Sequence, residues 1–363
     1  MFGFGKTRPI VGLDIGSSAV KAVELKAVGK GYRVVAFGSE PIPFDSIVDG
    51  AIVDGPAVAE AIRRLLDGHR FRSKQIAASL SGNAVIVKRI SVPTMTDAEL
   101  AESIQWEAEP HVPFDIQDVN LDFQILNPGV AEASAGARGG TPAATMDVLL
   151  VAAKKDRVAD YTNVIVQAGR VPVVVDVDAF ALQNAYESNY GLESNTVIVL
   201  LNAGASAMNI NILGGDQSLF RRDISIGGNA YTEAVLKELN LPFHDAESLK
   251  KGQPVDGATY EDALPILHAM TESVLREISK TLDFFRATAS SDRIDRVLLS
   301  GGSARVDGFA QALEERFETP VEMFDPFKRI AFEPLKFGVI DPQQVVPTLA
   351  VAVGLALRRV GDR

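Results

Sequence analysis

Two segments of the chain share one pattern of apolar and polar positions. In each segment an apolar run leads into a short turn of small polar residues, and a second apolar run follows. The turn reads DIGSSA at 14–19 and NAGASA at 202–207. Apolar runs separated by a Gly/Ser turn predict a β-hairpin. Because the pattern occurs twice, it predicts a duplicated fold with a cleft between its two halves.

Between these hairpins the pattern changes repeatedly between helical and strand periods. Apolar rows spaced three or four residues apart predict helices, whereas alternation or a short apolar run predicts a strand. The expected helices cover about 55–66, 97–109 and 157–168, and the expected strands cover 75–80, 85–90, 119–125, 146–152 and 171–177. Thr96 and Glu99 have the spacing of a capping box, which predicts the start of the second helix.

The C-terminal part continues the mixture of strands and helices. After the second hairpin we expect a strand, a Gly227–Gly228 turn and a helix, then a long helix from about 260 to 289. An apolar strand at 297–299 and a buried helix at 345–357 follow. The segment 128–145 is rich in Gly, Ala, Pro and Ser, which predicts a mobile loop.

Composition and charge exclude several classes of function. The chain has 363 residues, 47% of them hydrophobic, and a net charge of −11, so it is long enough for two core-forming units. The negative charge disfavours a broad nucleic-acid face and general adhesion to an anionic membrane. There is no cysteine, and four scattered histidines predict no metal site. No signal peptide and no run of about 18 apolar residues is found.

The two glycine-serine turns have the residue types that cradle a phosphate. Backbone amides that can approach an oxygen closely, together with small hydroxyls, suit that task. The candidates are Asp14, Gly16, Ser17, Ser18 and Lys21 in the first turn, and Asn202, Gly204 and Ser206 in the second. Asp14 could hold a hydrated Mg²⁺, and Lys21 could meet a phosphate. Two ordinary hairpin turns are the alternative interpretation.

Two further motifs have the chemistry to contact a nucleoside. Glu247 and Lys250 are three residues apart, so on a helix they would face together and could bind ribose hydroxyls. Gly301, Gly302 and Ser303 follow an apolar strand, where glycines would let a purine lie close to the backbone. A surface ion pair and a turn that needs positive φ are the alternatives. The Gly227–Gly228 turn is counted with these candidates.

Taken together, these segments resemble the actin-like ATPases. GLDIGSSAVKAVEL and LLNAGASAMNINIL resemble the two phosphate loops, VLLSGGSARVDG the adenosine loop, and AESLK the ribose pair. The segment VPTMTDAELAESIQWEAEPHVPFDIQDVNLDFQIL and the segment VDVDAFALQNAYE narrow the resemblance to the FtsA-like PilM family of type IV pilus proteins. The resemblance implies ATP or ADP with Mg²⁺ as cofactors.

The resemblance also implies a fold and its subdivision. It implies an α/β, actin-like two-domain fold with duplicated ribonuclease-H-like halves and an FtsA-type 1C subdomain. The implied boundaries are 1–83 and 172–195 for subdomain 1A, 84–171 for 1C, 196–230 and 296–363 for 2A, and 231–295 for 2B.

The implied function is that of a scaffold. Proteins of this family are cytoplasmic components of the pilus platform and twitching-motility machinery, and they bind the N-terminal cytoplasmic peptide of PilN. We therefore expect recruitment to the inner face of the inner membrane through partners alone, with other platform proteins and motor ATPases as further possible partners.

Two alternatives stay open within the same superfamily. One is an FtsA-like division filament, although FtsA-like chains end in an amphipathic membrane helix and this sequence ends at Arg363 without one. The other is a small-metabolite kinase, although no motif supplies the carboxylate base that a kinase needs.

The second phosphate loop departs from the family pattern at its first position. That position is usually Asp and here is Asn202. An amide carries no charge and cannot act as a base. We therefore expect nucleotide binding with slow or absent hydrolysis, and no residue is assigned a catalytic role.

Overall fold

The computed structural model describes residues 9–127, 145–193, 195–215, 217–288, 293–338 and 341–362. It consists of two compact units, the larger comprising 1–82 and 164–360 and the smaller comprising 83–163 with 361–363. The expected mobile loop 128–145 lies outside the described residues except for Thr145, which begins a strand. The four subdomain boundaries given above stay a prediction.

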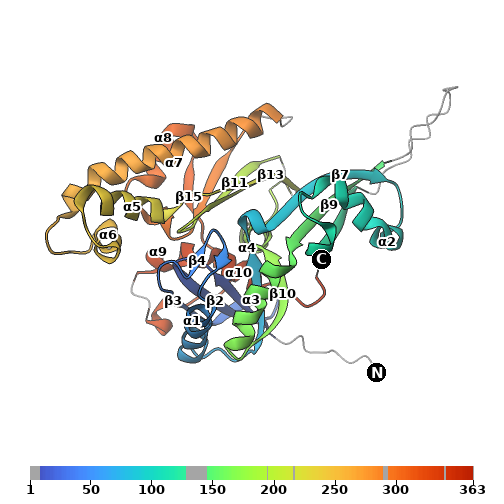
Figure 1. Ribbon diagram of the computed structural model, residues 1–363, viewed down its shortest axis with the longest axis horizontal. Helices are drawn as coiled ribbons and strands as arrows, with labels where there is room; N and C mark the ends of the chain where they lie inside the picture. Colours follow the sequence, from blue (N-terminus) through green and yellow to red (C-terminus); the bar gives the residue numbers. More distant parts are fainter. Residues whose placement is uncertain are drawn as a thin grey trace. The chain divides into compact units, whose positions relative to one another are not determined.

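The first sheet of the larger unit has the strand order β10-β6-β1-β2-β3 (Figure 1). Its strands are β1 (Val11–Ile15), β2 (Ala19–Val28), β3 (Gly31–Pro41), β6 (Gln75–Leu80) and β10 (Val171–Val177). β1 pairs antiparallel with β2 and parallel with β6. The first predicted hairpin is therefore β1–β2, and the strands predicted at 75–80 and 171–177 are β6 and β10.

The second sheet repeats this arrangement, in the order β13-β12-β11-β14-β15. Its strands are β11 (Val197–Ala203), β12 (Met208–Gly214), β13 (Gln217–Ile224), β14 (Arg296–Ser300) and β15 (Val321–Met323). Here too an antiparallel hairpin, β11–β12, is followed by parallel strands on its far side. The duplication that the sequence predicts is confirmed strand by strand.

Helices fill the space around the two sheets. They are α1 (Gly55–Gly68), α4 (Asp178–Tyr190), α5 (Gly228–Leu239), α6 (Phe243–Lys250), α7 (Tyr260–Thr288), α8 (Phe309–Phe317), α9 (Pro342–Val345) and α10 (Ala350–Ala356). A two-residue ladder, β4 (Ile47–Val48) with β5 (Ala51–Ile52), precedes α1. The final helix expected at 345–357 is broken by a 3-10 turn at Val346–Leu349, where Pro347 lacks an amide proton.

The helix α10 lies unusually close to its neighbours, β1 and α4. A Cβ atom placed on Gly12 of β1 would lie 2.0 Å from the carbonyl oxygen of Ala352, and one on Gly354 would lie 1.7 Å from that of Ala181. Glycine is thus required by backbone-to-backbone contact at both positions. The surrounding core joins α4 and α10 to side chains of both sheets, which include Val23 and Leu298.

The smaller unit is a three-stranded sheet with one helix that contributes to its core. The strand order is β7-β9-β8, with β7 at Val85–Pro93, β8 at Val119–Asn127 and β9 at Thr145–Lys154. The helix α2 (Asp97–Ala108) buries Leu100, Ile104 and Ala108 in the core of this unit. Thr96 and Glu99 form the predicted capping box. The last helix, α3 (Lys155–Gln167), begins in this unit and ends in the larger one.

Within the described residues, every helix is too short or too polar to cross a bilayer.

Candidate functional site

The first phosphate-loop candidate is the turn between β1 and β2. The amide of Gly16 donates to the carbonyl of Ala19 at 3.2 Å, which closes a tight turn. A Cβ on Gly16 would approach that carbonyl to 3.1 Å, so a larger residue would crowd it. Asp14 and Lys21 face each other across the two strands, and their side chains form an ion pair at 3.0 Å. Both are mostly shielded from water, with exposed fractions of 16% and 17%.

The second candidate, between β11 and β12, has the same backbone geometry. The amide of Gly204 donates to the carbonyl of Ala207 at 2.9 Å. A Cβ on Gly204 would lie 2.7 Å from that carbonyl, closer than such contacts allow. The repeat in the sequence is therefore a repeat of one turn, closed by one type of hydrogen bond.

The side chains that flank the two turns differ in charge. Asn202 faces Asn209 across the second hairpin, at the place where Asp14 faces Lys21 in the first. The amide of Asn202 donates to that of Asn209 at 3.1 Å, and Asn209 donates to Asp223 on β13 at 2.8 Å. An ion pair in one half thus corresponds to a chain of neutral amides, ending at a carboxylate, in the other.

The two halves meet at the phosphate-loop candidates. The hydroxyl of Ser17 donates to that of Ser206 at 2.9 Å, so the two turns touch. Near them the amide of Gly82 donates to the carboxylate of Asp223 at 2.6 Å. Farther along the chain the ring of Phe44 lies against that of Phe243, with centroids 3.8 Å apart. These contacts join segments of the first half to segments of the second.

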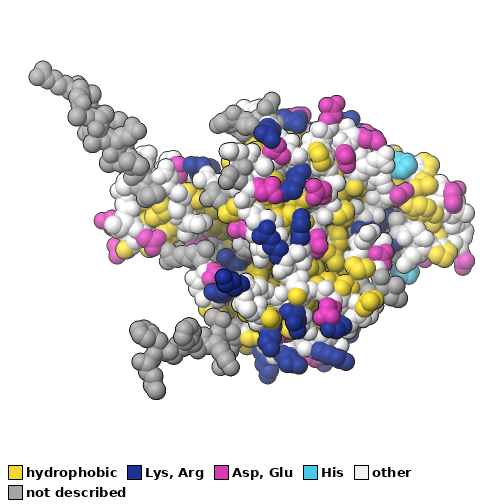
Figure 2. All heavy atoms as spheres, turned by 180° about the vertical axis from the view of Figure 1, so that it is seen from behind, with side chains coloured by type: hydrophobic (Ala, Val, Ile, Leu, Met, Phe, Trp, Pro, Cys, Tyr) yellow, Lys and Arg dark blue, Asp and Glu magenta, His cyan; other side chains and the backbone are white. Residues whose placement is uncertain are grey.

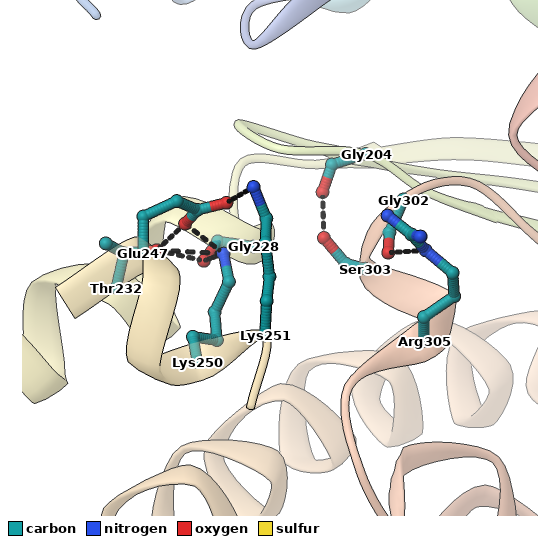
Figure 3. A network of polar contacts seen from close by, with 9 residues as sticks. All are labelled: Gly204, Gly228, Thr232, Glu247, Lys250, Lys251, Gly302, Ser303 and Arg305. Carbon is teal, nitrogen blue, oxygen red and sulfur yellow. Dashed lines mark hydrogen bonds and ion pairs between the residues drawn. The ribbon is translucent and has the colours of Figure 1, made fainter. Parts of the chain in front are cut away.

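The Gly227–Gly228 turn and the 301–303 turn pack directly onto the second phosphate-loop candidate. Gly228 donates its amide to the carbonyl of Gly204 at 3.0 Å. The hydroxyl of Ser303 donates to the same carbonyl at 2.7 Å, as Figure 3 shows. A Cβ on Gly228 would lie 2.3 Å from the Ser303 hydroxyl, so a larger residue there would displace that side chain from its hydrogen bond with Gly204. Gly301 adopts a φ of 93° against the backbone of Ala203.

Glu247 and Lys250 lie on α6, with their side chains beside Gly228 of the Gly227–Gly228 turn (Figure 3). The two form an ion pair at 2.5 Å, and Lys250 also donates to the carbonyl of Gly228 at 3.0 Å. Thr232 donates to Glu247 and accepts from Lys250. Burial opposes ionisation of Glu247, but the charge of Lys250 and these hydrogen bonds outweigh it and hold the pKa of the carboxyl below its ordinary value. Burial lowers the pKa of Lys250, and Glu247 counteracts it.

Gly302 differs from the other glycines of the site. Its φ is −67°, which any residue adopts, and a Cβ there would meet no atom within 4 Å. Neither backbone conformation nor packing requires glycine at this position. Next to it, the guanidinium of Arg305 is held by Gln344 at 2.9 Å, and burial lowers its pKa. The sequence interpretation did not include Arg305.

A half-buried carboxylate was also missed from the sequence. Asp178 begins α4 and accepts a hydrogen bond from Ser79 at 2.5 Å. Part of the residue is exposed to water, but loss of hydration around the carboxyl raises its pKa to about 7. The negative charge of Asp14 also raises the pKa, and Asp223 has a smaller effect. Asp178 lies in the segment VDVDAFALQNAYE, which carries part of the family resemblance but predicted no site role for this residue; the fold places it beside Asp14.

The described residues contain no group of three or more acidic or histidine side chains arranged to hold a metal ion. A hollow of about 390 Å³ between α5 and α7, lined in part by Pro265, Ile266 and Met270, includes none of the candidate residues. The candidate turns instead form a cluster linked by the hydrogen bonds Ser17–Ser206, Gly228–Gly204 and Ser303–Gly204, and Lys250 of α6 bonds to the carbonyl of Gly228.

Comparisons with known proteins give the family. The sequence profile of "Type IV pilus assembly protein PilM" matches residues 12–360. A solved structure, the "PilM-PilN type IV pilus biogenesis complex", is 32% identical and has a TM-score of 0.84, covering 98% of this chain and 100% of that one. The chain belongs to the PilM family. The expected family and the actin-like fold are both confirmed.

More distant similarities agree with this fold. The cell division protein FtsA of Enterococcus hirae is 22% identical, over 93% of this chain and 82% of that protein. MreB5 of Spiroplasma citri bound to AMPPNP has a TM-score of 0.51 at 14% identity, covering 96% of this chain and 95% of that one. At such identity only the actin-like fold is shared.

In this PilM-family chain the site residues fit a nucleotide. No protein atom lies within 4 Å of a Cβ placed on Gly302, so a ligand has room to approach the backbone there. The adjoining turns present amides and hydroxyls. Asp14 is a single carboxylate, and Mg²⁺ is commonly bound by one or two carboxylates together with substrate phosphates. Glu247, Lys250 and Arg305 surround the same turns with charged groups.

Proposed function

We propose that this PilM-family chain is a nucleotide-binding scaffold of type IV pilus assembly that binds the N-terminal cytoplasmic peptide of a PilN-like membrane protein. The observation that carries the proposal is the whole-length similarity to a PilM solved together with PilN. The partner would bring the chain to the inner face of the inner membrane. The FtsA-like alternative has weaker support, because similarity to FtsA is lower, at 22% identity.

The nucleotide would occupy the cluster of turns. Its phosphates would meet the amides of the two tight turns, and Lys21 would contribute a positive charge. Mg²⁺, held by Asp14 through water, would neutralise phosphate charge. The purine would lie over Gly302, and the Glu247–Lys250 pair would meet the ribose. We assign this arrangement to binding with slow hydrolysis, because Asn202 replaces the carboxylate expected in the second phosphate loop.

Removing either member of the Asp14–Lys21 pair should weaken ATP binding. A hydrogen bond to a charged group contributes about 1.5–3 kcal/mol, which corresponds to roughly a tenfold to hundredfold change in affinity. We expect Asp14→Ala and Lys21→Ala each to lose affinity in this range, measured by calorimetry with Mg²⁺ present. Lys26→Ala on the same strand removes the same charge far from the turn and should bind normally. Unchanged affinity in both site variants would exclude this location.

Hydrolysis should be slow because Asn202 stands where a carboxylate would act. Typical enzymes turn over about 1–10³ times per second. We expect phosphate release well below one per second from the unaltered chain, and a measurable increase in Asn202→Asp. Placing the same acid on the facing strand, in Asn209→Asp, should give no increase. Several turnovers per second from the unaltered chain would refute the stated reason.

The smaller unit offers a surface suited to an extended peptide. β7 is a terminal strand of its sheet, so one backbone edge can pair with an added strand. Its first residues, Val85, Ile86 and Val87, are half-buried and apolar. The segment 97–109 of the same unit, which is α2 and its C-cap residue Glu109, carries five acidic residues and no basic one. A peptide with apolar side chains and a basic residue would complement this surface.

A peptide from the N-terminus of a PilN-like protein should bind this unit with micromolar or better affinity. Such affinity needs only about −8 kcal/mol, which strand pairing with a few side-chain contacts can supply. The only tryptophan of the chain, Trp106 on α2, is 76% exposed, so binding nearby should change its fluorescence. Titration followed by Trp106 fluorescence shows whether the peptide binds near α2, and calorimetry measures its affinity.

The control separates this surface from the rest of the chain. Val85→Asp with Val87→Asp adds charge to the apolar strand and should reduce peptide affinity at least tenfold while ATP still binds. Leu335→Asp adds charge to the larger unit at a side chain that is 83% exposed, and should have no effect. Equal binding by all three proteins would place the partner elsewhere.

A further inference from the structure

Lys and Arg side chains gather at one edge of the first sheet. β1 and β6 are parallel, so the loop that leads into β6 lies at the same edge as the β2–β3 turn, opposite to the phosphate-loop candidates. The segments 26–33 and 69–74 at this edge contain six basic residues and no acidic one. We call these the basic edge: Lys26, Lys30, Arg33, Arg70, Arg72 and Lys74. Figure 2 shows a group of Lys and Arg side chains along the lower border of the molecule.

Hydrogen bonds tie the second segment to β2 and to the residue that precedes β1 by two positions. The amide of Arg72 donates to the carboxylate of Glu24 on β2 at 2.7 Å, and the hydroxyl of Ser73 donates to the carbonyl of Pro9 at 2.5 Å. The pairing of β1 with β2 ends at Val11 and Glu24. The β2–β3 hairpin beyond Glu24 therefore extends past β1, and its tip is free to approach a partner.

Repulsion between like charges of the basic edge destabilises the β2–β3 hairpin. Lys26 and Arg33 lie directly opposite each other in the hairpin, and like charges at that spacing destabilise a strand pair. All six side chains belong to exposed residues. The ion pairs found among the described residues include none of these six side chains, and Asp67, three residues before Arg70, is bound by Arg170. Glu333, which lies near Arg33, is itself bound by Lys336.

An exposed apolar residue lies among the basic residues of the hairpin. Val28 is 47% exposed at the hairpin turn, between Lys26 and Lys30. Long lysine side chains around an exposed apolar tip suit the interface of a bilayer, where the apolar group enters the headgroup layer and the ammonium groups meet anionic lipids. A nucleic-acid backbone would use the charges but offers no apolar layer for Val28.

We propose that the basic edge docks directly on an anionic phospholipid surface. This contact goes beyond the proposed function. The chain would attach to the membrane directly, in addition to its attachment through a membrane protein. Stable attachment to membranes commonly combines two weak signals. The net charge of −11 is an average over the molecule; the local charge of the edge is positive, so an anionic surface would attract this edge and repel most of the remaining surface.

Flotation with lipid vesicles tests the proposal on the full chain, without any protein partner. Each Lys or Arg near an anionic membrane contributes roughly a fivefold factor in binding. The triple variant Lys26→Gln, Lys30→Gln, Arg33→Gln should therefore bind vesicles containing phosphatidylglycerol about 100-fold more weakly than the unaltered chain. Binding should also fall with added salt and be absent on vesicles of phosphatidylcholine alone.

A second triple variant, Arg276→Gln, Lys280→Gln, Arg286→Gln on α7, changes the net charge equally and should bind as the unaltered chain does. Val28→Ser should weaken vesicle binding but leave binding of duplex DNA unchanged. No binding of the unaltered chain to anionic vesicles, or equal loss in both triple variants, would overturn the proposal. Tighter binding of DNA than of vesicles, with no effect of Val28→Ser on either, would assign the edge to nucleic acid instead. Thermal melting of each variant confirms that it is folded.

Discussion

Gly354→Ala is expected to destabilise the chain by about 3 kcal/mol or more. Overpacking a well-filled interior costs about 1–3 kcal/mol and sometimes more. Here the added Cβ would lie 1.7 Å from the carbonyl oxygen of Ala181, and the opposing atom is backbone that cannot rotate away. Either α10 or α4 must move, and both helices help to form the core shared by the two sheets. Loss of soluble protein on expression is the extreme form of this result.

Urea denaturation measures the effect, with two other glycines for comparison. In Gly12→Ala the added Cβ would lie 2.0 Å from the carbonyl oxygen of Ala352 on α10, so this variant should be similarly destabilised. Gly302→Ala adds its Cβ to open space at an ordinary φ, so the free energy of unfolding should change by less than about 1 kcal/mol. ATP affinity should nevertheless fall in Gly302→Ala. A denaturation midpoint in Gly354→Ala equal to that of the unaltered chain would contradict the packing.

The second large effect is a change in how stability depends on pH. In the folded chain the pKa of Asp178 is raised from 3.8 to about 7, mainly by lost hydration. Between these values the folded state binds more protons than the unfolded state, so the free energy of unfolding contributed by this group falls as pH rises. The slope approaches 1.4 kcal/mol per pH unit. At most about 2 kcal/mol should be lost between pH 5 and pH 7.

Asp178→Asn isolates this contribution, because its amide does not titrate but can still accept the hydrogen bond from Ser79. Unfolding by urea at pH 5, 6, 7 and 8, without metal or nucleotide, should show the variant gaining stability relative to the unaltered chain up to about pH 7. Above that pH the difference should level off. A constant difference across the whole range would mean that Asp178 is already ionised in the folded chain.

Local patterns predict much of the fold because their physical causes are local. The Gly/Ser turns at 14–19 and 202–207 are closed within four residues, and the T-x-x-E cap of α2 is formed by side chains three residues apart. The strands predicted at 75–80 and 171–177 have the same bounds in the structure. Several strands were missed, among them the three-residue β15 and the long β3; β3 mixes polar and apolar residues over Gly31–Pro41, and pairing with β2 stabilises it as a strand.

The sequence by itself determined the repeated hairpin, the order of most elements and the residue types around the phosphate-loop candidates. Only the tertiary structure decided which distant residues join them. Asp223 enters through a hydrogen bond from Asn209 on the neighbouring strand, and Asp178 through its position at the start of α4 beside Asp14. The high pKa of Asp178 and the need for glycine at 354 both come from atoms far away in sequence. Burial and close contact depend on packing between elements, which a pattern along one segment does not encode.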